Sequence, residues 1–445
     1  MKRLYEAEAY TPDWPDSHWR RTLPLPAPAP TLKGQATAEV AVIGAGYAGL
    51  SAAHELATRF GADVAVLEAV QPGWGASGRN GGFCCLGGSK LSDRAIIRRV
   101  GEAGARAFLA FQRAAIEDVA AFLDSHGIDA RQGPEGETYL AHSPAAYREL
   151  AAAAAADPSS RLIPLEGLAE AGLAGPVFHG ALQVAQGFAL HPLAYVEGLA
   201  RVAVAAGVRI HGNSPVLHLA PEGGGWRLDT PEGSLHAKRV LVATNGYSSE
   251  DLPRWLAGRS LPAMSSIMVT RPISAEERAA QGFTSALMAA DTRTALHYFR
   301  HLPDGRFLFG MRGGTSAAPA AIATTQARVR SHFDAMFPAW NGVETESRWS
   351  GFVCLTGSLA PFVGRVPGAE GLFAALGWHG SGVAPASRGG RLAAQLIAGA
   401  APEIPALMAA PPRRFPLPAF RRTALAAGYL AADLRDGALS PAGRR

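Results

Sequence analysis

Residues 40–50 read VAVIGAGYAGL, and this stretch decides the fold. Its first four residues are apolar and mostly β-branched, which predicts a short buried strand that ends at Ile43. Gly44, Gly46 and Gly49 follow, and apolar residues at helical spacing predict a helix over roughly 47–60. In such a strand–turn–helix the first glycine permits the tight turn, the second lets a pyrophosphate approach the main chain, and the third lets the helix pack on the strand. The start of the helix then offers free N–H groups to the phosphates.

A carboxylate ends the next strand. The segment VAVLE at 64–68 predicts a second buried strand, so the two strands and their helix form a parallel strand–helix–strand unit. Glu68 stands about twenty residues after Gly49, where a carboxylate can bind ribose hydroxyls. Because a carboxylate repels a 2′-phosphate, NADP is disfavoured, and NAD and FAD remain.

Two further segments favour FAD over NAD, and a third offers hydrogen-bond donors. Residues 75–82 read GASGRNGG, a loop in which the main chain can approach a flat ring while Arg79 and Asn80 offer polar contacts. Residues 240–246 read VLVATNG, another buried strand that ends in small residues. A strand near 372–375 is followed by a glycine-rich loop and a helix, so this loop is expected to present N–H donors to an electron-rich oxygen.

The composition describes a globular protein and excludes several classes of partner. The chain has 445 residues, of which 48% are hydrophobic and 18% charged, enough to bury a large core. The net charge is +5 without a dense basic run, so no nucleic-acid partner is expected. No apolar run has the length of a membrane span and the N-terminus lacks a signal-peptide core, so a cytoplasmic location without a membrane span is expected.

The cysteines indicate a reducing compartment. Cys84, Cys85 and Cys354 are an odd set with an adjacent pair, which does not make a disulfide framework. Adjacent cysteines without a second pair are also poor metal ligands, and no metal site is predicted.

The expected fold class is α/β, or mixed α+β: a discontinuous FAD-binding Rossmann-like domain with an inserted antiparallel-sheet substrate domain. Short apolar segments between 261 and 315, two of them separated by a turn at 303–305, predict the inserted sheet. The expected parts are an N-terminal arm at 1–38, the FAD-binding domain at 39–90, 190–250 and 350–400, the substrate domain at 91–189 and 251–349, and a C-terminal tail packing on the body at 401–445.

Taken together, these segments resemble the D-amino-acid-oxidase-like superfamily of FAD-dependent oxidoreductases, and most of all its γ-glutamylputrescine oxidase and L-pipecolate oxidase group. The resemblance rests on the glycine turn, Leu67-Glu68-Ala69, residues 76–82, His191-Pro192, residues 243–246, Gly364-Arg365, residues 377–383 and the tail at 414–421. It implies that Gly81 and Gly82 lie by the isoalloxazine ring, that Val216 meets the adenine through its main chain, and that Gly380 to Val383 cradle the pyrimidine end.

The motifs and the resemblance together give a set of expected contacts to a non-covalently bound FAD. They are Gly44, Gly46, Tyr47, Ala48, Gly49, Glu68, Ala69, Ala76, Ser77, Arg79, Asn80, Gly81, Gly82, Val216, Ala243, Thr244, Asn245, Gly246, Gly380, Ser381, Gly382 and Val383. Cys84 follows the 76–82 loop closely, and Cys354 is offset from the linking cysteine of the sarcosine-oxidase-like members, so no covalent link is expected.

The expected reaction is removal of a hydride from the carbon next to an amine nitrogen of a small amine or amino acid. The cofactor carries this chemistry, and the protein orients the substrate. The imine product hydrolyses to an aldehyde or keto acid, and the electrons pass to O2 or another acceptor. A dehydrogenase that reduces a quinone or carrier protein, a non-catalytic flavoprotein and a plain NAD-dependent dehydrogenase remain as alternatives.

Four residues are candidates for substrate contact or catalysis. Tyr298 and Arg300 lie two apart on one expected strand and share a face, so Arg300 could bind a carboxylate or sit equally well on a solvated face. His379 lies in the glycine-rich loop after the strand near 372–375. It could polarise the flavin, or the main chain could satisfy its hydrogen bonds. Trp349 is a candidate pocket wall, although tryptophan is more often found in a core. Many relatives carry Thr-x-Asp where this chain has Thr356-Gly-Ser358, so the substrate of any one relative is not carried over to this chain.

Overall fold

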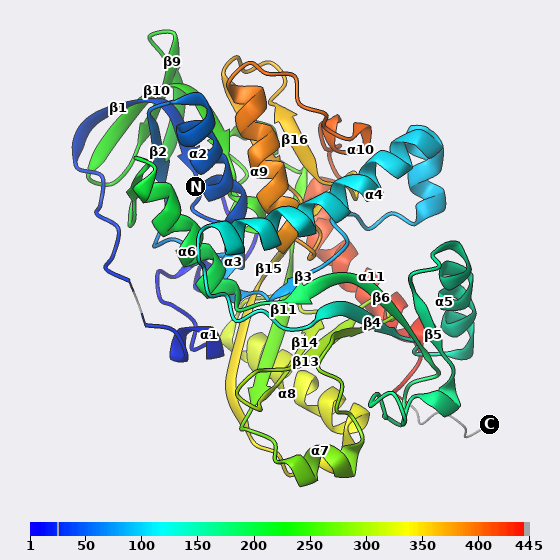
Figure 1. Cartoon of the computed structure of the whole chain (residues 1–445). Helices are drawn as coiled ribbons and strands as arrows, with labels where there is room; N and C mark the ends of the chain where they lie inside the picture. The colour runs from blue at the N-terminus through cyan, green and yellow to red at the C-terminus, as the bar shows by residue number, and fades with distance from the viewer. Residues whose placement is uncertain (25, 440–445) are drawn as a thin grey trace.

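Two β-sheets at opposite ends of the molecule organise the chain (Figure 1). The computed structural model describes residues 1–24 and 26–439; Leu25 and the last six residues of the expected C-terminal tail lie outside the described part. The first sheet has eight strands, and its main path is β16-β17-β10-β1-β2-β7. These strands are β16 (Phe362–Arg365), β17 (Leu372–Leu376), β10 (Gly233–Val242), β1 (Gly34–Ile43), β2 (Val64–Leu67) and β7 (Arg209–His211).

All neighbours on this path run parallel except β16 and β17, as the strand–helix–strand pattern predicts. The expected helix over 47–60 is α2 (Tyr47–Phe60). It packs with α6 (Pro192–Ala205) and α9 (Val383–Ile397) around residues of one sheet face such as Val42 and Val66. Residues of the other face, such as Ala41 and Ala65, pack with the hairpin β8 (His218–Glu222) and β9 (Gly225–Asp229). Since both faces are covered, the strands are continuously apolar.

The second sheet has nine strands, with the main path β15-β11-β14-β13-β12-β4-β6-β3 and with β5 paired to β6. In chain order the strands are β3 (Phe83–Cys84), β4 (Glu135–Leu140), β5 (Arg161–Ile163), β6 (Ala181–Ala189), β11 (Ser260–Thr270), β12 (Met288–Asp291), β13 (His297–His301), β14 (Phe307–Arg312) and β15 (Thr345–Thr356). Its pairs are antiparallel with one exception: β12 and β4 run parallel, so the sheet is mixed where a purely antiparallel one is expected.

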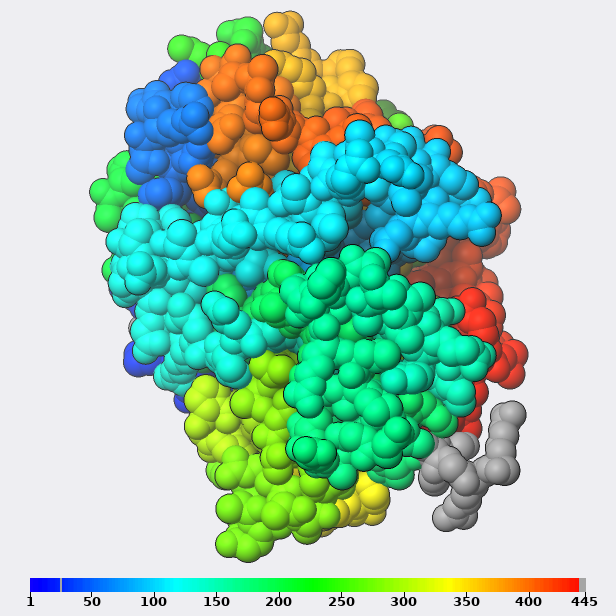
Figure 2. All heavy atoms as spheres, turned by 45° about the vertical axis from the view of Figure 1, so that its right-hand side comes forward, coloured from blue at the N-terminus to red at the C-terminus, as the bar shows by residue number. Residues whose placement is uncertain are grey.

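Helices cover the second sheet and the space between the sheets. An aromatic core that includes Phe299, Phe307 and Phe333 lies between this sheet and α8 (Pro319–Met336), with α7 (Ala275–Gln281) nearby. The long α4 (Asp93–Ser125) is interrupted at Gly101, where φ is 72°. It crosses the molecule below α9, which it contacts (Figure 2). The alanine-rich segment forms α5 (Pro144–Ala156), as its propensity predicts.

The structure divides the chain differently from three of the expected ranges. The arm ends earlier than residue 38, because β1 already begins at Gly34 and pairs with β10 there. The 39–90 and 350–400 ranges each contribute a strand to the second sheet, β3 and the end of β15. The C-terminal α11 (Arg421–Asp436) is attached to the arm, where Arg422 pairs with Glu6 at 2.7 Å, and to the body, where Arg421 pairs with Glu250 at 2.5 Å. No helix among the described residues is long and apolar enough to cross a membrane.

Candidate functional site

Four neighbouring parallel strands end at the same edge of the eight-stranded sheet. Ile43 of β1 is in register with Leu67 of β2 and Val242 of β10, and Val242 is in register with Ala374 of β17. The residues that follow these strands therefore meet: Gly44, Glu68, Ala243 and Gly377. Ligands of open parallel sheets bind in the crevice outside the carboxyl ends of the strands.

The glycine turn can be built only from glycines. Gly44 has φ +106°, which side chains rarely adopt. A Cβ on Gly49 would lie 1.9 Å from the Gly44 carbonyl oxygen, so the third glycine lets α2 pack against the turn. A Cβ on Gly46 would lie 2.8 Å from Ser77 Oγ and would fill the approach to the main chain. The first N–H groups of α2, which have no partner within the helix, face this space.

Glu68 is buried at the end of β2. Its Oε2 accepts a hydrogen bond from Ala45 N–H at 2.7 Å, and its Oε1 accepts one from Val70 N–H at 3.2 Å. Burial raises the pKa of Glu68, while the main-chain N–H groups oppose that rise. The carboxylate is thus held beside the glycine turn, at the position expected for a ribose contact.

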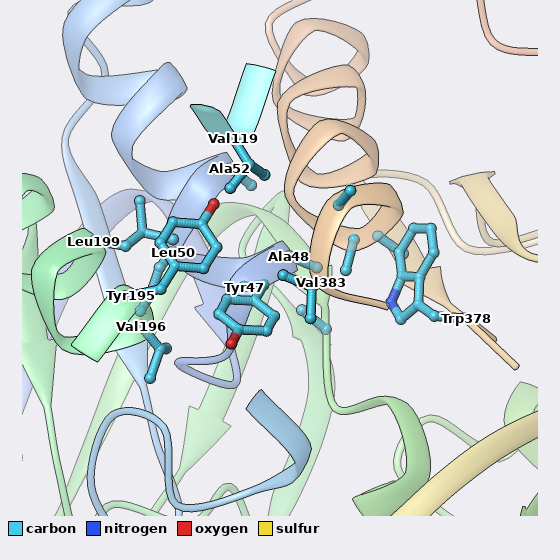
Figure 3. Packing of buried hydrophobic residues seen from close by; sticks show 14 of the residues in the cluster. Tyr47, Ala48, Leu50, Ala52, Val119, Tyr195, Val196, Leu199, Trp378 and Val383 are labelled. Atoms are coloured by element: carbon cyan, nitrogen blue, oxygen red, sulfur yellow. The ribbon is translucent and has the colours of Figure 1, made fainter. Parts of the chain in front are cut away.

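Tyr47 fixes the start of α2 against the neighbouring loop and helix (Figure 3). Its hydroxyl donates to the carbonyl oxygen of Ser77 at 2.8 Å or of Pro192 at 3.0 Å, and its ring stacks on Tyr195 with 4.8 Å between centroids. The Tyr47 N–H donates to Ser77 Oγ at 3.0 Å. These contacts connect α2, α6 and the 76–82 loop into one support for the turn.

A cavity of about 660 Å³ runs from this sheet edge to the second sheet. Nearly all the expected cofactor contacts line it: Gly44, Gly46, Tyr47, Ala48, Glu68, Ala69, Ala76, Ser77, Arg79, Asn80, Gly81, Val216, Ala243, Thr244, Asn245, Gly380, Ser381, Gly382 and Val383. Gly49, Gly82 and Gly246 are not in the lining. Each allows a close approach behind it; a Cβ on Gly82, for example, would lie 2.0 Å from the Leu190 carbonyl oxygen.

The family model of FAD dependent oxidoreductases, DAO, matches residues 39–396. The chain belongs to this family. It is 31% identical over 421 residues to the gamma-glutamylputrescine oxidoreductase of Escherichia coli, covering 92% of this chain and 95% of that protein. It is 30% identical over 410 residues to the "Probable oxidoreductase OrdL" of Rhizobium meliloti, covering 91% and 92%. Among solved structures, glycine oxidase from Geobacillus kaustophilus is similar with a TM-score of 0.69 and 20% identity, covering 83% and 96%.

The cofactor of the DAO family is FAD, and the cavity fits it. Two helices, α2 and α9, begin at the cavity, so N–H groups that have no partner within the helix lie at its wall. The glycine positions leave room for main-chain contact, and Glu68 supplies an acceptor for hydroxyl groups. These are the donor and acceptor types that a pyrophosphate, a ribose and a flavin ring require.

The 79–81 segment of this DAO-family site is held from behind by three distant side chains. Trp349 Nε1–H donates to the carbonyl oxygen of Arg79 at 2.7 Å, and Trp19 Nε1–H donates to that of Asn80 at 2.9 Å. Arg300 donates through Nε to the carbonyl oxygen of Gly81 at 3.1 Å and through Nη2 to that of Leu190 at 2.7 Å.

This arrangement corrects the expectation for two of the four candidate residues. Arg300 and Trp349 are absent from the cavity lining, because their polar atoms point into the back of the loop. Arg300 is 2% exposed and its guanidinium lies over Trp19 at 5.6 Å, so it is neither on a solvated face nor free to bind a substrate carboxylate.

His379 also lies outside the cavity lining. Its Nε2 accepts a hydrogen bond from Thr356 N–H at 3.1 Å, and its Nδ1–H donates to the carbonyl oxygen of Gly88 at 3.0 Å. Burial lowers the pKa of His379 to about 3, so the ring is neutral. Both ring nitrogens of His379 therefore form hydrogen bonds with the main chain, which is the second alternative given above. These bonds hold the Gly377–Gly382 loop in place.

Tyr298 is the one candidate of the four that lines the cavity. Its hydroxyl is 2.8 Å from Ser265 Oγ, and burial raises its pKa to about 12. The opposite register position holds Gly310, where a Cβ would lie 2.1 Å from the Tyr298 ring. The ring thus lies across β14 and faces the cofactor end of the cavity.

Sequence reasoning missed two charged residues of this wall, Arg312 and Glu137. Arg312 ends β14, and a Cβ on Gly380 would lie 2.4 Å from its Nη2, so its guanidinium adjoins the α9 loop. Its side chain has no hydrogen bond or ion pair with any other described residue. Arg312 lies beyond the end of the strand expected at 306–309. The only local signal that could have found it is the continuation of this strand through Gly310.

The cysteines differ in position. Cys85 and Cys354 line the cavity, whereas Cys84 is buried behind it. Burial raises the pKa of Cys354 to about 12 and raises that of Cys84 and Cys85 as well. A thiol in this state is a poor nucleophile.

Proposed function

We propose that this protein oxidises a carboxylate-bearing amine at the carbon next to its nitrogen, with FAD bound non-covalently by the cavity residues described above. The observation that carries the proposal is Arg312. It is a guanidinium that has no acidic partner among the described residues, in a cavity that also contains the expected cofactor contacts. A free guanidinium in an enclosed site binds a carboxylate with two parallel hydrogen bonds.

Bound FAD would accept a hydride from the substrate, and the protein's residues would place that C–H bond. Arg312 anchors the carboxylate beside the Gly380 loop. On the second sheet, Tyr298 forms the polar part of the wall and Ile267 forms the apolar part. The substrate amine reacts in its neutral form, so the site needs no strong acid–base pair. The raised thiol pKa values support non-covalent binding.

The names of relatives support the amine class. The E. coli relative is a gamma-glutamylputrescine oxidoreductase, and glycine oxidase shares the fold. The three buried, unpaired cysteines support a cytoplasmic site of action.

The test is bleaching of the flavin absorbance without oxygen by a panel of polyamine derivatives, pipecolate, N-methyl amino acids and D-amino acids. Reduction by at least one amine is expected, and reduction by none would overturn the proposal. Hydrogen peroxide yield in air then separates an oxidase, which we propose, from a dehydrogenase that reduces a quinone or a carrier protein. Acid precipitation checks the non-covalent link, since the pellet is expected to be colourless.

A further inference from the structure

Glu137 is a buried carboxylate in the wall of the same cavity. It lies on β4, is 4% exposed, and lines the cavity together with Tyr139. Its Oε2 accepts a hydrogen bond from the Tyr139 hydroxyl at 2.7 Å. None of the ion pairs between described residues includes Glu137.

The other buried acidic residues of the described chain have stronger partners. Asp291 contacts His297 at 2.5 Å and Arg293 at 3.7 Å, and Glu55 contacts Arg59 at 3.1 Å and Arg391 at 3.5 Å. Glu68, described above, accepts two main-chain hydrogen bonds.

Glu137 therefore stands apart, because its two neutral donors, the Tyr139 phenol and the Cys85 thiol, compensate only weakly for burying a charge. Burial raises its pKa to about 7, and no cationic group opposes that rise. A cation that entered the cavity would find this carboxylate available.

The register of the second sheet separates Glu137 from Arg312. Between their strands the order is β14-β13-β12-β4, which is three steps of about 4.8 Å each. Tyr298 and Ala290, on the intervening strands, are paired in register, and Ala290 is paired with Tyr139. All of these residues line the cavity, so one sheet face presents a cationic end, a middle and an anionic end.

We propose that Glu137, with the Tyr139 hydroxyl, binds a second, positively charged nitrogen of the substrate, remote from the carbon that is oxidised. The substrate is then an extended amine with a carboxylate at Arg312 and an ammonium group at Glu137. This inference rests on the proposed function, since it assigns the second end of the same substrate site. Among the described residues neither side chain has an ion-pair partner, and this ligand would give one to each of them.

The experiment compares substrates that differ only in the remote ammonium group. The pairs are D- and L-lysine with D- and L-norleucine, ornithine with norvaline, and putrescine with butylamine. Flavin reduction without oxygen gives kcat/KM, and the shift of the melting temperature gives binding independently of turnover. Wild type is expected to prefer the charged member of at least one pair by about tenfold or more.

The decisive variant is Glu137→Gln, which keeps the shape and removes the charge. It is expected to lose the preference and to leave kcat/KM for the uncharged member within about threefold. Glu135→Gln, an exposed position on the same strand, is the matched control and is expected to change neither. Tyr139→Phe keeps the carboxylate and is expected to reduce the preference in part, which provides a second test if Glu137→Gln folds poorly.

The outcomes separate this inference from the proposed function. An undiminished preference in Glu137→Gln, or no preference for a charged member in any pair, by either readout, overturns the inference and leaves the amine oxidation standing. If no amine reduces the flavin but the charged members still raise the melting temperature of wild type and not of Glu137→Gln, the proposed function fails and the cation site stands.

Discussion

The two walls of the cavity are built differently. The edge of the eight-stranded sheet offers mainly main-chain N–H groups from glycine turns and helix starts, and its charged contact Glu68 follows directly from a strand of the motif. The nine-stranded sheet offers side chains instead: Glu137 from β4, and Tyr298 and Arg312 from the distant hairpin of β13 and β14. A main-chain site tolerates no added atoms, whereas a side-chain site depends on which residue each strand places on the cavity face.

The largest effect is expected from one methyl group added to the wall at the edge of the eight-stranded sheet. Gly49→Ala places a Cβ 1.9 Å from the Gly44 carbonyl oxygen, and the turn must distort. Such overpacking costs up to about 3 kcal/mol, and the same loss in binding free energy would weaken FAD binding by up to about 100-fold. Flavin absorbance of the purified protein and titration of apoprotein with FAD measure the effect. Gly428→Ala, on α11 with no atom within 4 Å, is the control, and an equal loss there would contradict the argument.

The two arginines of the second sheet are expected to affect different properties, substrate oxidation and FAD affinity. Arg312→Met is expected to lower kcat/KM for a carboxylate-bearing amine by about 100-fold, since a lost charged hydrogen-bonded pair costs about 2–5 kcal/mol, and to leave FAD affinity nearly unchanged. Arg300→Met is expected to do the reverse, because it leaves the carbonyl oxygens of Gly81 and Leu190 without donors. Substrate kinetics and FAD titration of both variants provide the test. A similar substrate defect in both would place Arg300 in the substrate site after all.

A smaller effect is expected from a change behind the loop at 76–82. Trp349→Phe removes the donor to the Arg79 carbonyl oxygen and keeps most of the packing. A lost hydrogen bond to a buried acceptor costs about 1–3 kcal/mol, so FAD affinity is expected to fall by about tenfold. Trp226→Phe removes the same type of bond, to the Glu370 carbonyl oxygen, outside the cavity lining. Unchanged FAD affinity is expected for Trp226→Phe, and equal affinities in the two variants would count against the role of Trp349.

The smallest expected effect concerns pH. His191 caps α6, where its Nδ1 accepts from Ala194 N–H at 3.1 Å, and burial lowers its pKa to about 3. Below the ordinary histidine pKa of about 6.5 only the unfolded chain takes up this proton, so stability falls as pH falls from there towards 3. His379 contributes in the same direction.

His191→Asn keeps a good N-cap acceptor and removes the titration. Between pH 6 and 4 this variant is expected to lose less unfolding free energy than wild type. The difference is at most about 1.4 kcal/mol per pH unit. Denaturant unfolding at a series of pH values measures the slope, and identical slopes in both proteins would show that His191 does not titrate in this way.

Local sequence patterns predict the wall at the edge of the eight-stranded sheet and the fold around it. VAVIGAGYAGL at 40–50 predicts β1, the turn and α2, and Glu68 follows from the next strand. These features are local, because a run of β-branched residues, three glycines and a helical period act within about thirty residues. Any chain that makes this turn presents the same N–H groups, whatever the rest of the fold does.

The wall on the nine-stranded sheet depends on tertiary structure. Alternation along β13 places Tyr298 and Arg300 on one face, as expected, but only the packing of Gly81, Leu190 and Trp19 puts Arg300 behind the loop at 76–82. The register across β4, β12, β13 and β14 then places Glu137 and Arg312 on one face of the sheet, in the wall of one cavity. Because β4 lies more than a hundred residues from the other three strands in the chain, no local pattern predicts that these two charged side chains share a face of the folded sheet.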